Sequence, residues 1–144
     1  RLDRYINSVG KIAGINNHMG SYYTQDANKM RVLLARIKDR NLFFLDSHTI
    51  PNTVGKQIAD ELKLPCLVNN VFIDHIDTPE AIINEFSQLC YLARRRGYAI
   101  GIGHVQRKNT AKVFAEIIPE LQREGYRFVH LSEIFKIKQK TKER

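Results

Sequence analysis

Short apolar runs alternate along this chain with amphipathic, helix-like segments, and histidines stand where the runs end. The runs are apolar at every position, which is typical of strands buried on both faces of a parallel sheet. The carboxyl ends of such strands are where polar side chains gather around a ligand. All five histidines lie at these ends: His18, His48, His75, His104 and His130. The sequence therefore predicts an α/β fold with a site at one edge of a parallel sheet.

Helices are predicted between the apolar runs because apolar residues recur there at helical spacing. The chain opens with a helix that ends near Gly10, and Asp26 begins a second. Thr78 and Asn109 are expected to be the N-cap residues of two long helices. Pro119 is expected to kink or divide the last of them, because proline removes a backbone donor.

The predicted order of elements is α-β-α-β-α-β-β-α-β-α-β. We expect parallel strands at residues 12–15, 42–45, 99–102 and 127–129. A complete (β/α) barrel needs about 200 residues or more, whereas this chain has 144 and opens with a helix. The expectation is therefore one α/β domain over residues 1–135, the back half or two-thirds of a larger barrel or doubly wound domain, followed by a basic tail over residues 136–144.

Composition excludes some classes of protein. The hydrophobic content of 43% supports a continuous core, and no apolar run is long enough to span a membrane. The net charge of +8 is concentrated in the basic tail, and no nucleic-acid-binding motif accompanies it, so we expect no nucleic acid partner. Cys66 and Cys90 lack metal-site spacing and are expected to be small buried residues.

Four segments carry recognisable motifs. Residues 14–21 read GINNHMGS and are followed by Thr24, which resembles a GVNNHMGS…T signature. Residues 42–49 read LFFLDSHT, with His48 in place of the arginine of LFFLDSRT. Residues 71–75 read VFIDH, with His75 in place of the asparagine of VFLDN. Residues 97–104 read GYAIGIGH and resemble GxAIAIGH. Together the motifs resemble the divergent polysaccharide deacetylase family over nearly the whole chain.

The resemblance implies a partial, distorted (β/α) barrel of the polysaccharide-deacetylase type. It implies metal-dependent hydrolysis of N- or O-acetyl groups on an extracytoplasmic carbohydrate. It also implies a preceding portion of the protein that carries an Asp-Asp strand end and a further histidine. Because such a fragment would leave a sheet edge unpaired, we expect it to form homo-oligomers or to associate with that N-terminal portion.

Deacetylation needs an activated water, a polarised carbonyl and a proton for the departing group. Zinc or another divalent metal supplies the first two when histidine and aspartate hold it. The resemblance assigns His18 as a metal ligand and His104 as general acid or ligand, and we expect Asp46 to share in catalysis. Contacts to the carbohydrate are predicted from four further residues: Asn16, Asn17, Ser21 and Asp74.

Alternatives remain for these residues and for the protein. His18 is alternatively a turn histidine and His104 a strand-end histidine bound to its surroundings. Asp46 and Asp74 are equally compatible with orienting a histidine, binding metal, contacting sugar or capping a turn. The HxxxH ligand pair of related enzymes is missing, since Tyr22 follows His18 at that spacing. The alternative function is therefore a carbohydrate-binding or cell-envelope protein that keeps the fold without turnover.

Overall fold

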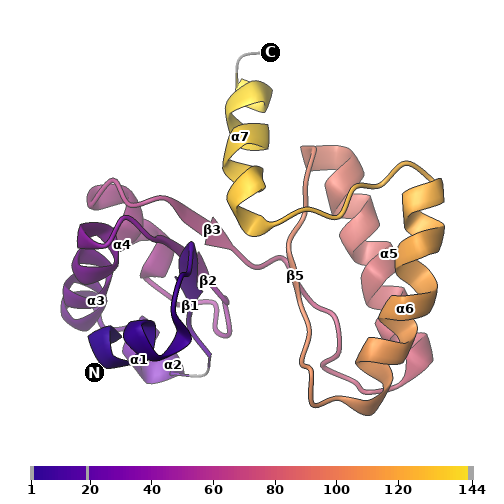
Figure 1. Cartoon of the computed structure of the whole chain (residues 1–144), viewed down its shortest axis with the longest axis horizontal. Helices are drawn as coiled ribbons and strands as arrows, with labels where there is room; N and C mark the ends of the chain where they lie inside the picture. The colour runs from indigo at the N-terminus through magenta and orange to yellow at the C-terminus, as the bar shows by residue number, and fades with distance from the viewer. Residues whose placement is uncertain (1, 19, 143–144) are drawn as a thin grey trace. The chain divides into compact units, whose positions relative to one another are not determined.

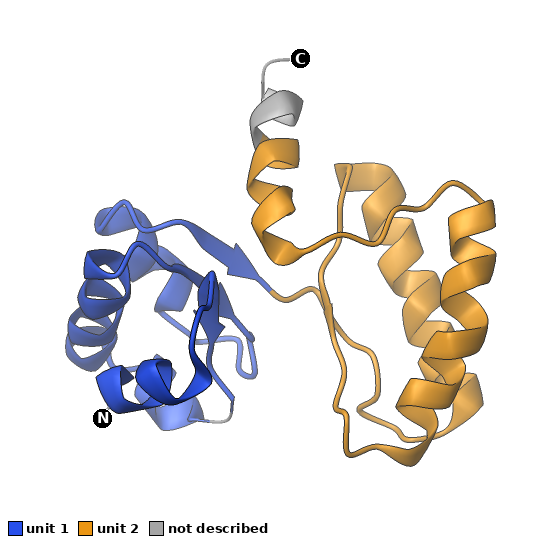
Figure 2. Ribbon diagram, in the orientation of Figure 1, with its two compact units in different colours: residues 1–68 blue, residues 69–144 orange. Residues whose placement is uncertain are grey.

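The computed structural model describes residues 2–18 and 20–142, with side chains up to residue 138. The chain forms two compact units, Arg1–Val68 and Asn69–Arg144, which we call unit 1 and unit 2 (Figure 2). Each contains its own parallel sheet and its own hydrophobic core.

Unit 1 is a three-stranded parallel sheet in the order β1-β2-β3. Ile15 of the first strand lies opposite Phe44 of the second, and Leu45 lies opposite Leu67 of the third. The parallel strands predicted near residues 12–15 and 42–45 are confirmed to within two residues. The elements of this unit are α1 (Leu2–Val9), β1 (Gly14–Asn16), α2 (Ser21–Thr24), α3 (Ala27–Asp39), β2 (Phe43–Asp46), α4 (Gly55–Glu61) and β3 (Cys66–Val68).

Helices α3 and α4 pack together and supply most of the core of unit 1 (Figure 1). Helix α3 begins where predicted, because the Asp26 carboxylate accepts the backbone N–H groups of Asn28 and Lys29 at 3.1 and 3.0 Å. Its spacing of three and four residues places one apolar stripe against Phe44 of β2. That stripe consists of Met30, Leu34 and Ile37, which are all fully buried.

Unit 2 pairs two short strands in parallel, with Val71 opposite Gly101 and Phe72 opposite Ile102. Helices α5 and α6 lie side by side (Figure 1), and Phe86 meets Phe114 edge to face at 5.0 Å between ring centroids. Thr78 caps α5 as predicted, through the N–H of Ala81. The elements are β4 (Val71–Phe72), α5 (Pro79–Arg96), β5 (Gly101–Ile102), α6 (Lys108–Arg123) and α7 (Leu131–Lys142).

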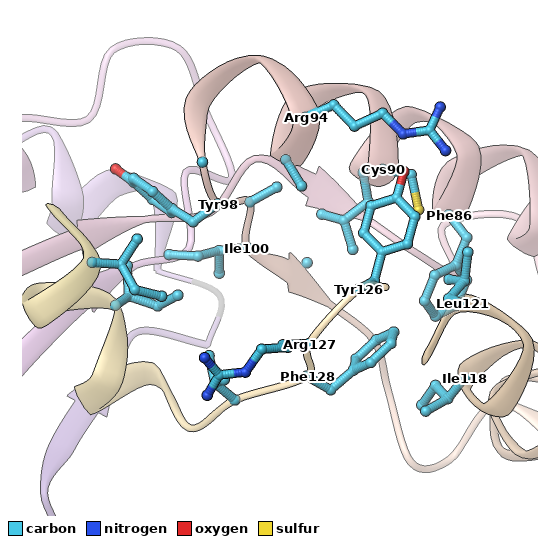
Figure 3. Close-up of a pocket in the computed structure, with 18 of the residues that line it drawn as sticks. Phe86, Cys90, Arg94, Tyr98, Ile100, Ile118, Leu121, Tyr126, Arg127 and Phe128 are labelled. Atoms are coloured by element: carbon cyan, nitrogen blue, oxygen red, sulfur yellow. The ribbon is translucent and has the colours of Figure 1, made fainter. Parts of the chain in front are cut away.

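The strand predicted at residues 127–129 is wrong. The segment has no regular structure, and no backbone hydrogen bond joins it to another segment in the described part of the chain. Arg127 and Phe128 instead line an apolar cavity of about 570 Å³, together with Tyr98 and Ile100 from the segment before β5 (Figure 3). Strands pair through hydrogen bonds between backbones about 4.8 Å apart, and no such bond joins residues 127–129 to the segment before β5 in the described part of the chain.

Two further corrections concern helix α6. Asn109 is not the N-cap of α6: the helix already begins at Lys108, and the Asp77 carboxylate accepts the N–H groups of Lys108 and Asn109. Pro119 does not divide the helix, which runs continuously to Arg123. A single proline removes one donor, and the packing of residues on both sides of it keeps the helix intact.

A helix also replaces most of the expected basic tail. Residues 136–142 continue α7 from Leu131. Leu131, Ile134 and Ile137 recur at helical spacing and line the cavity of unit 2, so one side of this helix faces apolar surroundings. Lys136 and Lys138 therefore belong to a helix that has one side toward an apolar cavity.

The described residues contain no helix that is both long enough and apolar enough to cross a bilayer. Cys66 is buried and Cys90 is partly buried, and both are free thiols. Burial raises the pKa of the Cys66 thiol to about 12. Because the thiolate is the reactive form, Cys66 is an unreactive core residue.

Candidate functional site

The Asn-rich loop after β1 and the loop after β2 are joined by hydrogen bonds in unit 1. The backbone N–H of Ser47 donates to Asn17 Oδ1 at 2.9 Å, and the Ser47 hydroxyl donates to the backbone oxygen of Asn17. Asn16 Nδ2 contacts Ser47 Oγ at 3.4 Å. The two predicted sugar-binding residues Asn16 and Asn17 therefore lie at one sheet edge, beside the end of β2.

Asp46, the predicted catalytic carboxylate of this unit, is fully buried at the end of β2. Its Oδ1 accepts the backbone N–H of His48 at 2.9 Å, and its Oδ2 accepts the Thr53 hydroxyl at 2.8 Å. Thr53 Oγ1 in turn accepts the N–H of Gly55, the first residue of α4. In this structure the carboxylate holds the β2–α4 loop, and its catalytic role stays a prediction.

His18 and Ser21 flank the turn between β1 and α2. His18, the predicted metal ligand, is exposed in the loop. Ser21 is the first residue of α2, and its carbonyl oxygen accepts hydrogen bonds from Thr24 and Gln25. Both residues belong to the same unit as Asn16 and Asn17, and their predicted roles toward metal and sugar stay predictions.

In unit 2 the structure brings Asp74 and His104 together. Asp74 follows β4 and His104 follows β5, so both lie at the carboxyl ends of the two paired strands. The ring Nδ1 of His104 lies 2.8 Å from Asp74 Oδ1. Because a carboxylate can only accept, Nδ1 carries the proton of this bond. The arrangement realises one of the alternatives open at the sequence level, in which an aspartate orients a histidine.

Asp74 is fully buried, and each of its oxygens has a donor. Oδ2 accepts the backbone N–H of His104 at 2.5 Å and the hydroxyl of Thr110 at 2.7 Å. Burial by itself would raise the pKa of Asp74, but the hydrogen bonds from His104 and Thr110 outweigh it, and the pKa lies below its ordinary value. Asp74 is therefore an ionised carboxylate at neutral pH.

This lowered pKa predicts that Asp74 stabilises the fold above the pKa of the unfolded carboxyl, about 3.9. The stabilisation is lost as the pH falls through the folded-state pKa. The free energy of unfolding should therefore decline as the pH falls below about 4. Urea denaturation should show a shallower decline for Asp74→Asn than for the wild type over this range. Parallel curves for the two proteins would contradict the prediction.

His104 is placed to exchange a proton. Its Nδ1 donates to Asp74, so a proton exchanged with a ligand would pass through Nε2, and the side chain is 33% exposed. A buried carboxylate behind an imidazole fixes the ring orientation. The geometry fits a general acid–base pair, and the catalytic role of His104 stays a prediction.

His75, which follows Asp74 directly, is not part of this pair. Its Nδ1 lies 3.3 Å from the backbone oxygen of Phe72 and 3.6 Å from Glu85 Oε1, and its side chain is half exposed.

Sequence reasoning missed three residues that support these loops. Thr53 holds Asp46, Thr110 holds Asp74, and Asp77 caps α6. Thr110 lies 36 residues from Asp74, so no local sequence pattern predicts this contact. A threonine in the first turn of a helix ordinarily suggests only local capping.

Comparison with known proteins identifies the family of this chain. Residues 1–135 match the divergent polysaccharide deacetylase family. The chain belongs to this family. An uncharacterized protein of Haemophilus influenzae is 37% identical over 113 residues, which are 78% of this chain and 40% of that protein. The uncharacterized protein YibQ of Escherichia coli is 37% identical over 99 residues, which are 69% of this chain and 31% of YibQ.

The fold of this divergent polysaccharide deacetylase chain also resembles a solved structure. A crystal structure of an uncharacterized protein from Agrobacterium tumefaciens C58 matches with a TM-score of 0.70 and 24% identity, covering 83% of this chain and 50% of that one. The likeness supports an α/β fold with parallel sheets and covering helices. The chain spans less than half the length of the curated relatives it matches.

The family implies a divalent metal, which needs a group of ligand side chains. Across residues 2–18 and 20–138, no three His, Cys, Asp or Glu side chains are grouped so that they could hold a metal ion. Catalytic zinc sites use three protein ligands, whereas both Asp74 oxygens already accept hydrogen bonds from His104 and Thr110. The described residues of this divergent polysaccharide deacetylase chain do not by themselves fit a zinc site.

Proposed function

We propose that this chain carries the proton-transfer part of a hydrolase that removes N- or O-acetyl groups from an extracytoplasmic carbohydrate. The observation that carries the proposal is the Asp74–His104 pair at the carboxyl ends of β4 and β5. Family membership supplies the reaction class, and the pair supplies a group able to perform one of its steps.

In the proposed reaction, His104 gives a proton through Nε2 to the nitrogen or oxygen that leaves when the acetyl group is cleaved. Asp74 keeps the ring in place by accepting its Nδ1–H. Asn16, Asn17 and Ser21 are proposed to contact sugar hydroxyls, since all three lie between the end of β1 and the start of α2. Hydrogen bonds to Ser47 hold Asn16 and Asn17 at the edge of the unit 1 sheet. Zinc or another divalent metal, with His18 among its ligands, stays a prediction. It applies to this chain joined to the N-terminal portion that the resemblance implies, which we call the longer protein.

A second candidate function is carbohydrate binding without turnover. It is favoured by one observation: among the residues that the structure describes, no group of side chains could hold a metal. A protein of this kind would use the Asn-rich loop to bind sugar and would release no acetate.

One experiment separates the two functions. The longer protein is incubated with acetylated amino-sugar oligomers and with O-acetylated oligosaccharides, and acetate release and calorimetric binding are measured with added zinc and with a chelator. Repeated turnover that depends on the metal supports the hydrolase. Saturable binding without acetate release supports the binding protein. The absence of both turnover and binding would refute both proposals.

A further inference from the structure

The Thr110 hydroxyl donates to Asp74, the carboxylate that bonds the ring of His104. We infer that Thr110 is a positioning residue for proton transfer by His104, because its hydroxyl sets the rotation of the Asp74 carboxylate. The inference rests on the proposed function of the pair. It assigns a role to a residue outside the four sequence motifs.

The two oxygens of Asp74 have different tasks. Oδ1 accepts the ring Nδ1–H of His104 at 2.8 Å, while Oδ2 accepts the backbone N–H of His104 at 2.5 Å and the Thr110 hydroxyl at 2.7 Å. The terminal torsion of an aspartate is broad and has no strongly preferred staggered value. Two donors on Oδ2 therefore restrict the carboxylate plane and keep Oδ1 directed at the ring.

The Thr110 side chain is itself held in one orientation. Thr110 is 5% exposed, and it carries a β-branch, which restricts its χ1 angle. A Cβ added at Gly103 would lie 3.2 Å from Thr110 Cγ2 and 3.5 Å from Asp74 Oδ2. The methyl group thus packs toward the glycine that precedes His104, and the hydroxyl is turned to the carboxylate.

The backbone of Thr110 is fixed to the loop that carries Asp74. Asp77, three residues after Asp74, accepts the N–H groups of Lys108 and Asn109 at 3.2 and 3.1 Å. Asn109 Nδ2 donates back to the backbone oxygen of Asp77 at 2.8 Å. These three bonds join the first turn of α6 to the β4–α5 loop, so Thr110 and Asp74 keep their separation.

The test compares substitutions that keep or remove the hydroxyl. Thr110→Val keeps the shape and removes the donor, Thr110→Ala removes it in a smaller side chain, and Thr110→Ser restores it. Ser87→Ala is the matched control, because it deletes an exposed helix hydroxyl elsewhere in unit 2. Nitrogen-15 NMR of the His104 imidazole reports the tautomer and the Nδ1–H bond in this chain, and acetate release is measured in the longer protein.

Thr110→Val and Thr110→Ala should weaken the Nδ1–H signal and should lower kcat about tenfold with KM unchanged, as expected for the loss of one hydrogen bond to a charged group. Thr110→Ser should recover both signals to within about twofold. Wild-type NMR and kcat in Thr110→Val would overturn the inference, as would equal losses in the valine and serine variants. Altered NMR in a protein whose wild type releases no acetate would uphold the positioning role and refute the proposed hydrolase.

Discussion

Replacing His104 by glutamine is expected to lower the rate of acetate release by the longer protein about 10²–10⁴-fold. Glutamine retains a polar side chain near Asp74 but cannot exchange a proton near neutral pH. The side chain of His104 is 33% exposed but bonds the buried Asp74 carboxylate, so its loss should lower the free energy of unfolding by about 1–3 kcal/mol. Initial rates of acetate release and urea denaturation of both proteins measure the two quantities.

His130→Gln provides the matched control for this experiment. His130 is also a histidine of unit 2, it is exposed, and its hydrogen bonds with Glu133 are made by its backbone N–H and backbone oxygen. Its replacement should leave acetate release unchanged. Equal losses in the two variants would indicate damage to the unit as a whole, and an unaffected rate in His104→Gln would remove His104 from the mechanism.

Replacing Gly55 by alanine is expected to lower the free energy of unfolding by about 2–3 kcal/mol. The added Cβ would overlap Asp46 Oδ2 and would lie 3.1 Å from Asp46 Cγ and 3.2 Å from Phe44 Cε1. The carboxylate cannot move aside without breaking its bonds to Thr53 and to the N–H of His48. Chemical denaturation followed by circular dichroism measures the change.

The expected loss of stability is opposite in sign to the effect of helix propensity alone. Alanine is the better helix former, so without the overlap Gly55→Ala would stabilise α4 by up to about 1 kcal/mol. Gln57→Ala, at an exposed position of the same helix, should stay within about 0.5 kcal/mol of the wild type. A stabilised Gly55→Ala protein would show that Asp46 is free to relocate and does not hold the loop in the way described.

The sequence by itself determined features that depend on near neighbours. Asp26 and Thr78 cap helices through backbone groups two or three residues away, and both helices begin where those residues predict. The uniformly apolar runs at Leu45 and Val71 belong to parallel strands, because burial on both faces leaves no polar alternation. The four motifs likewise identified the family, since they depend only on residue order.

Only the tertiary structure decided which polar groups meet. Asp74 and His104 are 30 residues apart, and Asp74 and Thr110 are 36 apart, so their contacts depend on the pairing of β4 with β5 and on the packing of α6. The same holds for Asp77, which caps α6 in place of Asn109. It also holds for residues 127–129, where Phe128 and Val129 suit a strand although no backbone in the described part of the chain bonds to them. A local pattern predicts which element a segment can form. Hydrogen bonds between distant residues depend on which segments the fold brings together.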